Sequence, residues 1–303
     1  MIVVRRRGAA RALLGALALP LLLGLATGCS TAPDRSGAAQ AMTDRLRALP
    51  GTLAVDGRYA NGRVEGVSFN VDVRMDANAD LDQVLATVDA YYDGLVDGDF
   101  AGHTSRYQVR LADDLIQVFG TEQHRDRPTD EVRRWFALVA QVPGAVHWAV
   151  GPDPATDIRS ISVEIPDTTP LAEAVAEIST DASDLADRRW IVRWRHLRLD
   201  LMGAPYPPDD IASTLERLAT EGDWSVVYDP ALNPTLTMAV WATSPNAMES
   251  TARQHLPIVS ELGLPVRYTV RGNGVEPAEV LVGGCLRGGS ALQQQLNDEF
   301  GTC

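Results

Sequence analysis

The residues best suited to bind a ligand lie in an arginine- and tryptophan-rich segment at 188–198, which reads RRWIVRWRHLR. On an extended strand successive side chains point to opposite faces, so the tryptophans and the middle arginines lie on different sides. Guanidinium groups grip carboxylates and phosphates with paired hydrogen bonds and stack on aromatic rings. We therefore predict a contact with an anion or an anionic lipid, made by Arg189, Trp190, Arg193, Trp194 and Arg195. The alternative is that the arginines pair with acids on neighbouring strands while the tryptophans fill the core.

Other local patterns favour no catalytic, metal or cofactor site. Residues 76–82 (DANADLD) alternate oxygen-bearing side chains, but Leu81 stands where a calcium loop needs glycine. Residues 283–290 (GGCLRGGS) match a phosphate loop except that Gly289 replaces its lysine, so we interpret them as a flexible loop. The five histidines lack metal-ligand spacing, and there is no Gly-x-Ser-x-Gly motif. We predict no catalytic residues, no metal and no cofactor, while a site assembled from distant segments stays open.

The N-terminal residues have the character of an export signal. Four arginines precede an apolar run at 13–26, which is shorter than the ~20 residues that a membrane-spanning helix needs. The sequence LATGC at 25–29 resembles the lipobox of bacterial lipoproteins, although Ala26 stands where a larger aliphatic residue is usual. The resemblance implies that 1–28 is a signal peptide, that cleavage precedes Cys29 and that lipid is attached to this cysteine. The alternative is an ordinary secreted protein cut near Ala26 or Gly28.

A lipid anchor defines the compartment and one partner. It places the protein on the extracytoplasmic face of the cell membrane, where residues 29–41, small and polar, are predicted to form a flexible tether. Cysteines in such a compartment are oxidised, so we predict a disulfide between Cys285 and Cys303. Unpaired thiols, or pairing with another protein, are the alternatives.

The charge of the chain excludes one class of partner. All 27 basic residues are arginine, as in proteins of GC-rich genomes such as those of actinobacteria, and the net charge is −13. Removing residues 1–28 takes away four arginines and no acid, so −13 becomes −17. Nucleic acid binding depends on neutralising phosphates, and docking on anionic lipid needs basic clusters, so this balance argues against nucleic acid and against broad lipid docking.

Apolar stripes at helical spacing predict three pairs of short helices. Asp80 and Gln83 form a predicted capping box, Thr169-Pro170 and Ser244-Pro245 are predicted helix starts, and Pro257 is predicted to kink or end its helix. The first helices carry Met42/Leu46/Leu49, Val132/Phe136/Val139 and Ile211/Leu215/Leu218. The second helices carry Leu81/Leu85/Val88, Leu171/Val175/Ile178 and Met248/Ala252 with His255 or Leu256. Before each second helix an alternating strand is predicted, at Val71/Val73/Met75, Ile161/Val163/Ile165 and Met238/Val240/Ala242.

These elements predict an α+β fold of tandem two-layer α/β sandwich units with small mixed sheets, in which αββαβ(β) occurs three times. The units span 42–120, 128–203 and 207–303, and a helix stapled by the disulfide ends the third. Each β-α-β step implies a parallel pair with a right-handed crossover. Whether the units share a sheet stays open. The order resembles the BON domain, an envelope module associated with phospholipid contact, although the glycine-punctuated second strand of that module is absent from residues 161–165.

From these features we predict a membrane-anchored, non-enzymatic binding or scaffold protein of the cell envelope, whose partner is an envelope protein or lipid. Two alternatives stay open. One is a carrier or sensor of an amphiphilic or anionic ligand, bound near the arginine- and tryptophan-rich segment. The other is a hydrolase with an unrecognised site.

Overall fold

The computed structural model describes residues 33–62, 66–100, 103–119, 126–150, 160–185, 188–203, 207–220 and 222–302. In these ranges one α-helix is followed by two strands, in six successive rounds, and a final helix closes the order. The elements are α1 (Ser36–Arg47), β1 (Thr52–Gly62), β2 (Gly66–Met75), α2 (Leu81–Asp97), β3 (Thr104–Leu111), β4 (Asp114–Phe119), α3 (Asp126–Val139), β5 (Ala145–Val150), β6 (Ser160–Ile165), α4 (Leu171–Asp181), β7 (Arg189–Trp194), β8 (Leu197–Met202), α5 (Asp209–Leu218), β9 (Asp223–Tyr228), β10 (Leu236–Trp241), α6 (Met248–Ser260), β11 (Val266–Arg271), β12 (Ala278–Val282) and α7 (Ala291–Phe300).

The twelve strands form one mixed sheet in sequence order, and the prediction of several small sheets is therefore wrong. Hairpin partners pair antiparallel, while successive hairpins pair parallel across a helix, as β2 pairs with β3. The same parallel pairing joins β4 to β5 and β8 to β9, across the predicted unit boundaries. Parallel neighbours need a crossover connection, and α3 and α5 supply it at these two positions. The sequence predicts these helices as the starts of new units, whereas here they connect strands of one continuous sheet.

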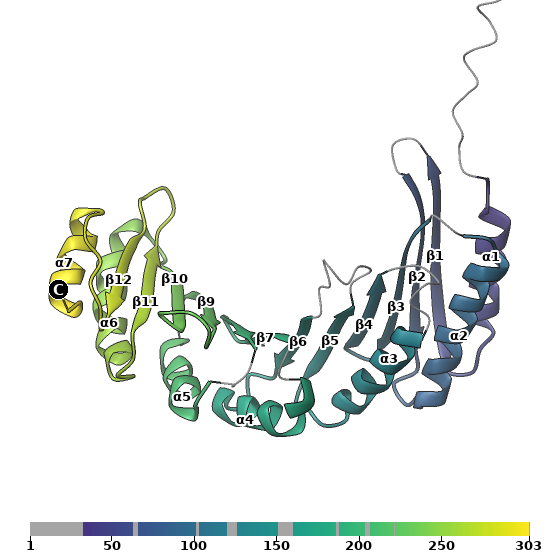
Figure 1. Ribbon diagram of the computed structural model, residues 1–303, viewed down its shortest axis with the longest axis horizontal. Coiled ribbons are helices and arrows are strands. Elements are labelled where there is room, and N and C mark those ends of the chain that lie inside the picture. Colours follow the sequence, from purple (N-terminus) through teal and green to yellow (C-terminus); the bar gives the residue numbers. More distant parts are fainter. Residues whose placement is uncertain are drawn as a thin grey trace, which may run out of the picture.

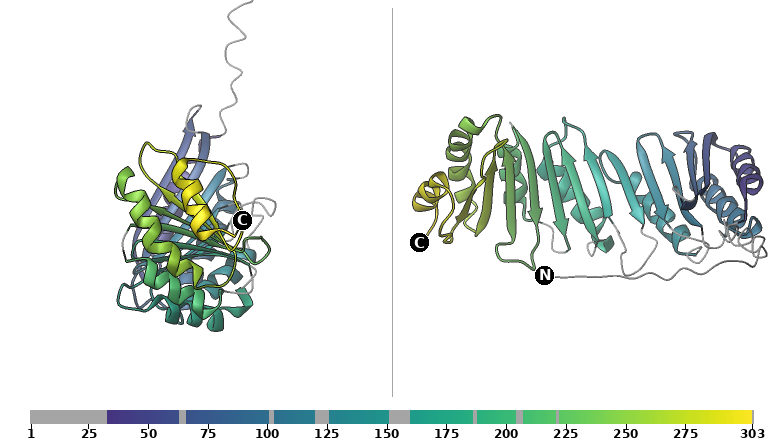
Figure 2. Two further views of the ribbon diagram at one scale, coloured as in Figure 1. Left: turned by 90° about the vertical axis from the view of Figure 1, so that its left-hand side faces the viewer. Right: turned by 90° about the horizontal axis from the view of Figure 1, so that it is seen from above.

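The sheet is curved, and the helices cover one of its faces. Figure 1 shows the helices along the outer, convex side of an arc and the strands along its inner, concave side. The view onto the concave side shows the strands in a row with no helix in front of them (Figure 2, right). On β2, Val71 and Val73 are buried against the helices, while Asp72 is only half-buried and Arg74 is exposed. Strand alternation thus builds the core between the layers and leaves a polar concave face.

The predicted helices are present, with shifts at their ends. Asp80 and Gln83 form the predicted capping box, and Ile211, Leu215 and Leu218 are all buried. α1 begins at Ser36, so half of the predicted tether is helical, as the alanine-rich sequence SGAAQA permits. In α3 the buried face contains Trp135, which the predicted stripe omitted. At the two helix starts predicted from Thr169-Pro170 and Ser244-Pro245, no side chain caps α4 or α6. The prediction that Pro257 ends its helix is wrong, because α6 continues past it to Ser260.

Side chains of α7 satisfy the free edge of β12. Gln293 Oε1 accepts a hydrogen bond from the Glu279 N–H at 3.2 Å, and Asn297 Oδ1 accepts one from the Leu281 N–H at 3.4 Å. Asn297 Nδ2 donates to the Glu279 carbonyl at 2.8 Å. The Thr302 N–H donates to the Gly284 carbonyl at 2.8 Å, which holds the C-terminus beside Cys285. Cys303, Cys29 and residues 1–28 lie outside the described residues, so the disulfide, the cleavage and the lipidation stay predictions.

Candidate functional site

The arginine- and tryptophan-rich segment forms the hairpin of β7 and β8, and its two tryptophans belong to the core. Trp190 and Trp194 are each 1 % exposed on the helix-covered face. Their indole N–H groups donate to the Leu185 carbonyl at 3.1 Å and to the Thr169 carbonyl at 3.0 Å. This burial corrects our prediction, because neither ring can contact a ligand on the concave side.

Three of the five arginines in the segment pair with acids of the protein, as the alternative interpretation held. Arg188 is buried and donates two hydrogen bonds to Glu131 of α3, at 2.9 and 3.0 Å. Arg189 and Arg198 each donate to Asp200 of β8 at 2.9 Å. Burial alone would raise the pKa of the Asp200 carboxyl, but these hydrogen bonds hold it below its usual value. These three arginines therefore stabilise the fold through ion pairs within the protein.

Arg193 remains available on the concave side, and Arg195 is exposed in the turn next to it. Arg193 is exposed and lies in register between Glu164 of β6 and Arg198 of β8, yet it has no ion pair within the described residues. Because Arg198 is already paired with Asp200, Arg193 is the cation of this strand pair that can receive an anion. Arg195, in the β7–β8 turn, stacks on Trp194 at 4.2 Å and donates to the Asp167 carbonyl at 3.2 Å.

A hollow with a volume of about 520 Å³ surrounds these arginines, and we call it the arginine hollow. Besides β7, the strands β5, β6, β8 and β9 contribute residues to it. Its lining side chains are His147, Glu164, Arg193, Arg195, His196, Leu197, Arg198, Asp223 and Trp224. His196 Nδ1 lies 3.6 Å from Asp223 Oδ1 at its far wall. The arginine segment thus supplies one side of a site whose other members come from β5, β6 and β9.

A second hollow, of about 660 Å³, adjoins the first, and we call it the acidic hollow. It shares His147 and Glu164 with the arginine hollow and adds Asp113, Asp114 and Asp167. Burial raises the pKa of the Asp114 carboxyl, and the hydrogen bond from the Val146 N–H at 2.7 Å opposes that rise. The two hollows together form one groove across the strands, which we call the rim groove, acidic at β4 and basic at β7 and β8.

One glycine allows the strands to meet closely at the centre of the rim groove. Gly144, just before β5, has φ +105°, and a Cβ there would lie 2.1 Å from the Glu164 carbonyl oxygen. Only glycine permits this conformation together with this contact. The close approach sets β5 against β6, where Glu164 pairs with Ala145 and His147 with Ser162, so the two residues that both hollows share are diagonal neighbours on one face.

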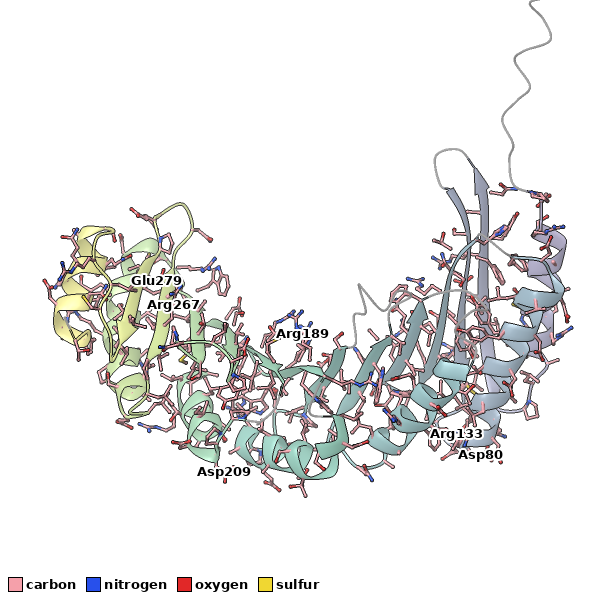
Figure 3. All side chains as sticks on the ribbon, viewed as in Figure 1. Asp80, Arg133, Arg189, Asp209, Arg267 and Glu279 are labelled. Atoms are coloured by element: carbon pink, nitrogen blue, oxygen red, sulfur yellow. The ribbon has the colours of Figure 1, made fainter. Side chains whose placement is uncertain are left out.

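Arginines concentrate on the sheet, although the chain as a whole is acidic. Within the described elements the strands contain nine arginines and seven acidic residues, whereas the helices contain seven arginines and seventeen acidic residues. Arg189 lies on the concave side and Arg133 and Asp209 lie on the convex side (Figure 3). The fold therefore separates charge, with acids dominating the convex helices and arginines slightly exceeding acids on the strands.

The described residues contain no group of three or more side chains placed to hold a metal ion. No helix within them is long and apolar enough to span a bilayer. No family model, no curated protein and no solved structure matches the chain. The sequence pointed to Arg193 and Arg195, but it missed His147, Glu164 and Asp113. His147 and Glu164 alternate with the buried residues of β5 and β6, which is a signal in the sequence, whereas Asp113 lies in the β3–β4 turn, where no such pattern marks it.

Proposed function

We propose that the protein is a lipid-anchored, extracytoplasmic lipoprotein that acts as a non-enzymatic binding scaffold of the cell envelope, through the concave face of its sheet. The observation that carries this proposal is the single uncovered face, which is polar and rich in arginine in an otherwise acidic molecule. A long open sheet face offers a continuous binding surface, whereas the acidic helices on the other side repel anionic surfaces.

The succession of one helix and two strands supports a tandem array as the origin of this surface. In repeat proteins each unit contacts its neighbours, and the array gains an extended concave surface as units are added. Here every strand pairs only with the strands that precede and follow it in sequence. The three predicted αββαβ(β) units would each supply two such rounds.

Metabolic labelling tests the anchor. Radiolabelled palmitate is expected to mark the wild-type protein and to leave a Cys29→Ala variant unmarked, because acyl transfer requires that thiol. Equal labelling of both proteins, or none of either, would overturn the assignment to the membrane surface.

Site-specific cross-linking tests the binding face in the native membrane. A photoactivatable residue at Ser162, which points to the concave side of β6, is expected to capture one dominant envelope component. The matched control is Glu173, an exposed residue on α4 of the convex side. Equal capture from both positions, or capture from Glu173 alone, contradicts a concave binding face.

A second candidate function is the carriage or sensing of a small anionic ligand. The arginine hollow favours it, because the exposed Arg193 lines it and has no ion pair within the described residues. Co-purification of a lipid or small acid, in place of a protein adduct at Ser162, would favour this function over the scaffold.

A further inference from the structure

The rim groove carries opposite charges at its two ends, and this arrangement selects a class of ligand. Asp113 is exposed in the β3–β4 turn at one end, and Arg193 is exposed on β7 towards the other. A purely anionic ligand would be repelled from the first end, and a purely cationic one from the second. Only a ligand that bears both charges, with spacing to match, satisfies the whole groove.

The register of the strands fixes that spacing. Asp113 lies in the turn between β3 and β4 and Arg193 lies on β7, so three to four strand intervals separate them. At ~4.8 Å per interval the separation is about 14–19 Å. An extended peptide advances ~3.4 Å per residue, so about four to six residues cover this length.

The geometry points to an extended peptide segment of four to six residues as the occupant of the rim groove, with a cationic group over Asp113 and a carboxylate at Arg193. This assignment rests on the proposed binding function and names the chemistry of the partner. Guanidinium groups recognise the planar carboxylate with paired hydrogen bonds, and the acids accept from the ammonium group. Glu164 and His147 at the centre supply polar contacts to the peptide backbone.

A panel of blocked pentapeptides tests the assignment on the purified full-length protein. Lys-Ala-Ala-Ala-Glu carries both charges, Lys-Ala-Ala-Ala-Gln lacks the carboxylate, and Gln-Ala-Ala-Ala-Glu lacks the cation. NMR titration, which measures millimolar Kd values, is expected to show that the first peptide binds about fivefold more tightly than either of the others, as partly exposed charge pairs of about 1 kcal/mol imply. No binding of the first peptide, or equal Kd values for all three, overturns the proposal.

Two variants assign each end of the ligand. Arg193→Gln is expected to reduce the preference for the Glu peptide over its Gln analogue to less than about twofold and to keep the preference for lysine. Asp113→Asn is expected to reduce the preference for the Lys peptide over its Gln analogue and to keep the preference for glutamate. The matched controls are Arg133→Gln and Asp130→Asn, which make the same charge changes at exposed positions of α3. If these controls shift the preferences as much as the groove variants, the effect is one of net charge and the assignment fails.

The peptide experiment and the cross-linking experiment at Ser162 can fail independently of each other. If Ser162 captures an envelope component but the three peptides bind equally, the proposed concave binding face stands and the proposed peptide ligand is wrong. If the protein distinguishes the peptides but Ser162 captures no protein, the proposed peptide ligand stands and the function is carriage of a short peptide.

Discussion

At the scale of single residues, the most perturbed titratable group near neutral pH is His255 of α6. Its side chain is buried, its Nδ1 lies 3.1 Å from Tyr268 Oη, and its ring contacts Trp224 at 4.7 Å between centroids. Burial lowers its pKa to about 4. In the unfolded chain this histidine has its ordinary pKa of ~6.5. Between pH ~6.5 and about 4 the imidazole is therefore protonated in the unfolded chain and neutral in the folded protein.

Stability is consequently expected to fall as the pH drops from about 6.5 to about 4, by a contribution on the order of 2 kcal/mol from this group. Urea unfolding across that range measures it. His255→Gln removes the titration, so the variant should lose the His255 part of the decline while keeping whatever the carboxylates contribute. Parallel pH profiles of the two proteins would contradict the assignment.

The buried pair of Glu131 and Arg188 is a second residue-scale determinant. Both side chains are under 10 % exposed, and the Arg188 guanidinium also lies 5.1 Å from the centroid of the Trp148 ring. Removing one partner leaves an uncompensated buried charge, so Glu131→Ala is expected to lower the free energy of unfolding by about 3–5 kcal/mol. Denaturant titration measures the loss. The double variant Glu131→Gln with Arg188→Met should recover part of it, and a loss below about 1 kcal/mol for the single variant would show that water reaches the pair.

At the scale of elements, local patterns determine far more of the fold than of the site. Alternation located the buried strand residues Val71, Val163 and Val240, and the capping box located the start of α2. The continuity of the sheet was not accessible in the same way, because the pairing of β4 with β5 depends on a contact across α3 and leaves no local periodicity. The same reason explains the missed site residues. His147 and Glu164 line the same hollow as Arg193 only through the register of β5, β6 and β7, and Asp113 reaches the groove only through the pairing of β4 with β5.

The last helix tests how an edge strand is protected. Unpaired edge groups are a template for association with another chain, and Asn297 of α7 satisfies those of Glu279 and Leu281. Asn297→Ala is expected to lower stability by about 1 kcal/mol and to promote self-association, because it leaves partly buried backbone groups unsatisfied. Light scattering after size-exclusion chromatography measures the association. Gln295→Ala, an exposed position on the same helix, is the control, and equal behaviour of both variants would contradict edge protection.

At the scale of the whole molecule, the arc has linear connectivity. Each strand pairs only with its sequence neighbours, so no contact in the sheet joins β1 to β12. In such arrays stability is a sum of local terms and interfaces between neighbours, and opening at one end can leave the other end closed. The same connectivity gives the concave face its extent, because none of the described helices folds back across it (Figure 2).

Hydrogen exchange resolves this connectivity strand by strand. Asn297→Ala is expected to raise the exchange rates of amides in β11 and β12 by about fivefold, as about 1 kcal/mol of local destabilisation implies, and to leave β2 and β3 unchanged. Glu131→Ala, placed at the centre of the arc, should act most strongly on β5 to β7, the strands beside its ion pair. A uniform rise over all strands in either variant would show that the sheet opens as one cooperative unit. The concave face could then not be loosened at one end while it holds a ligand at the rim groove.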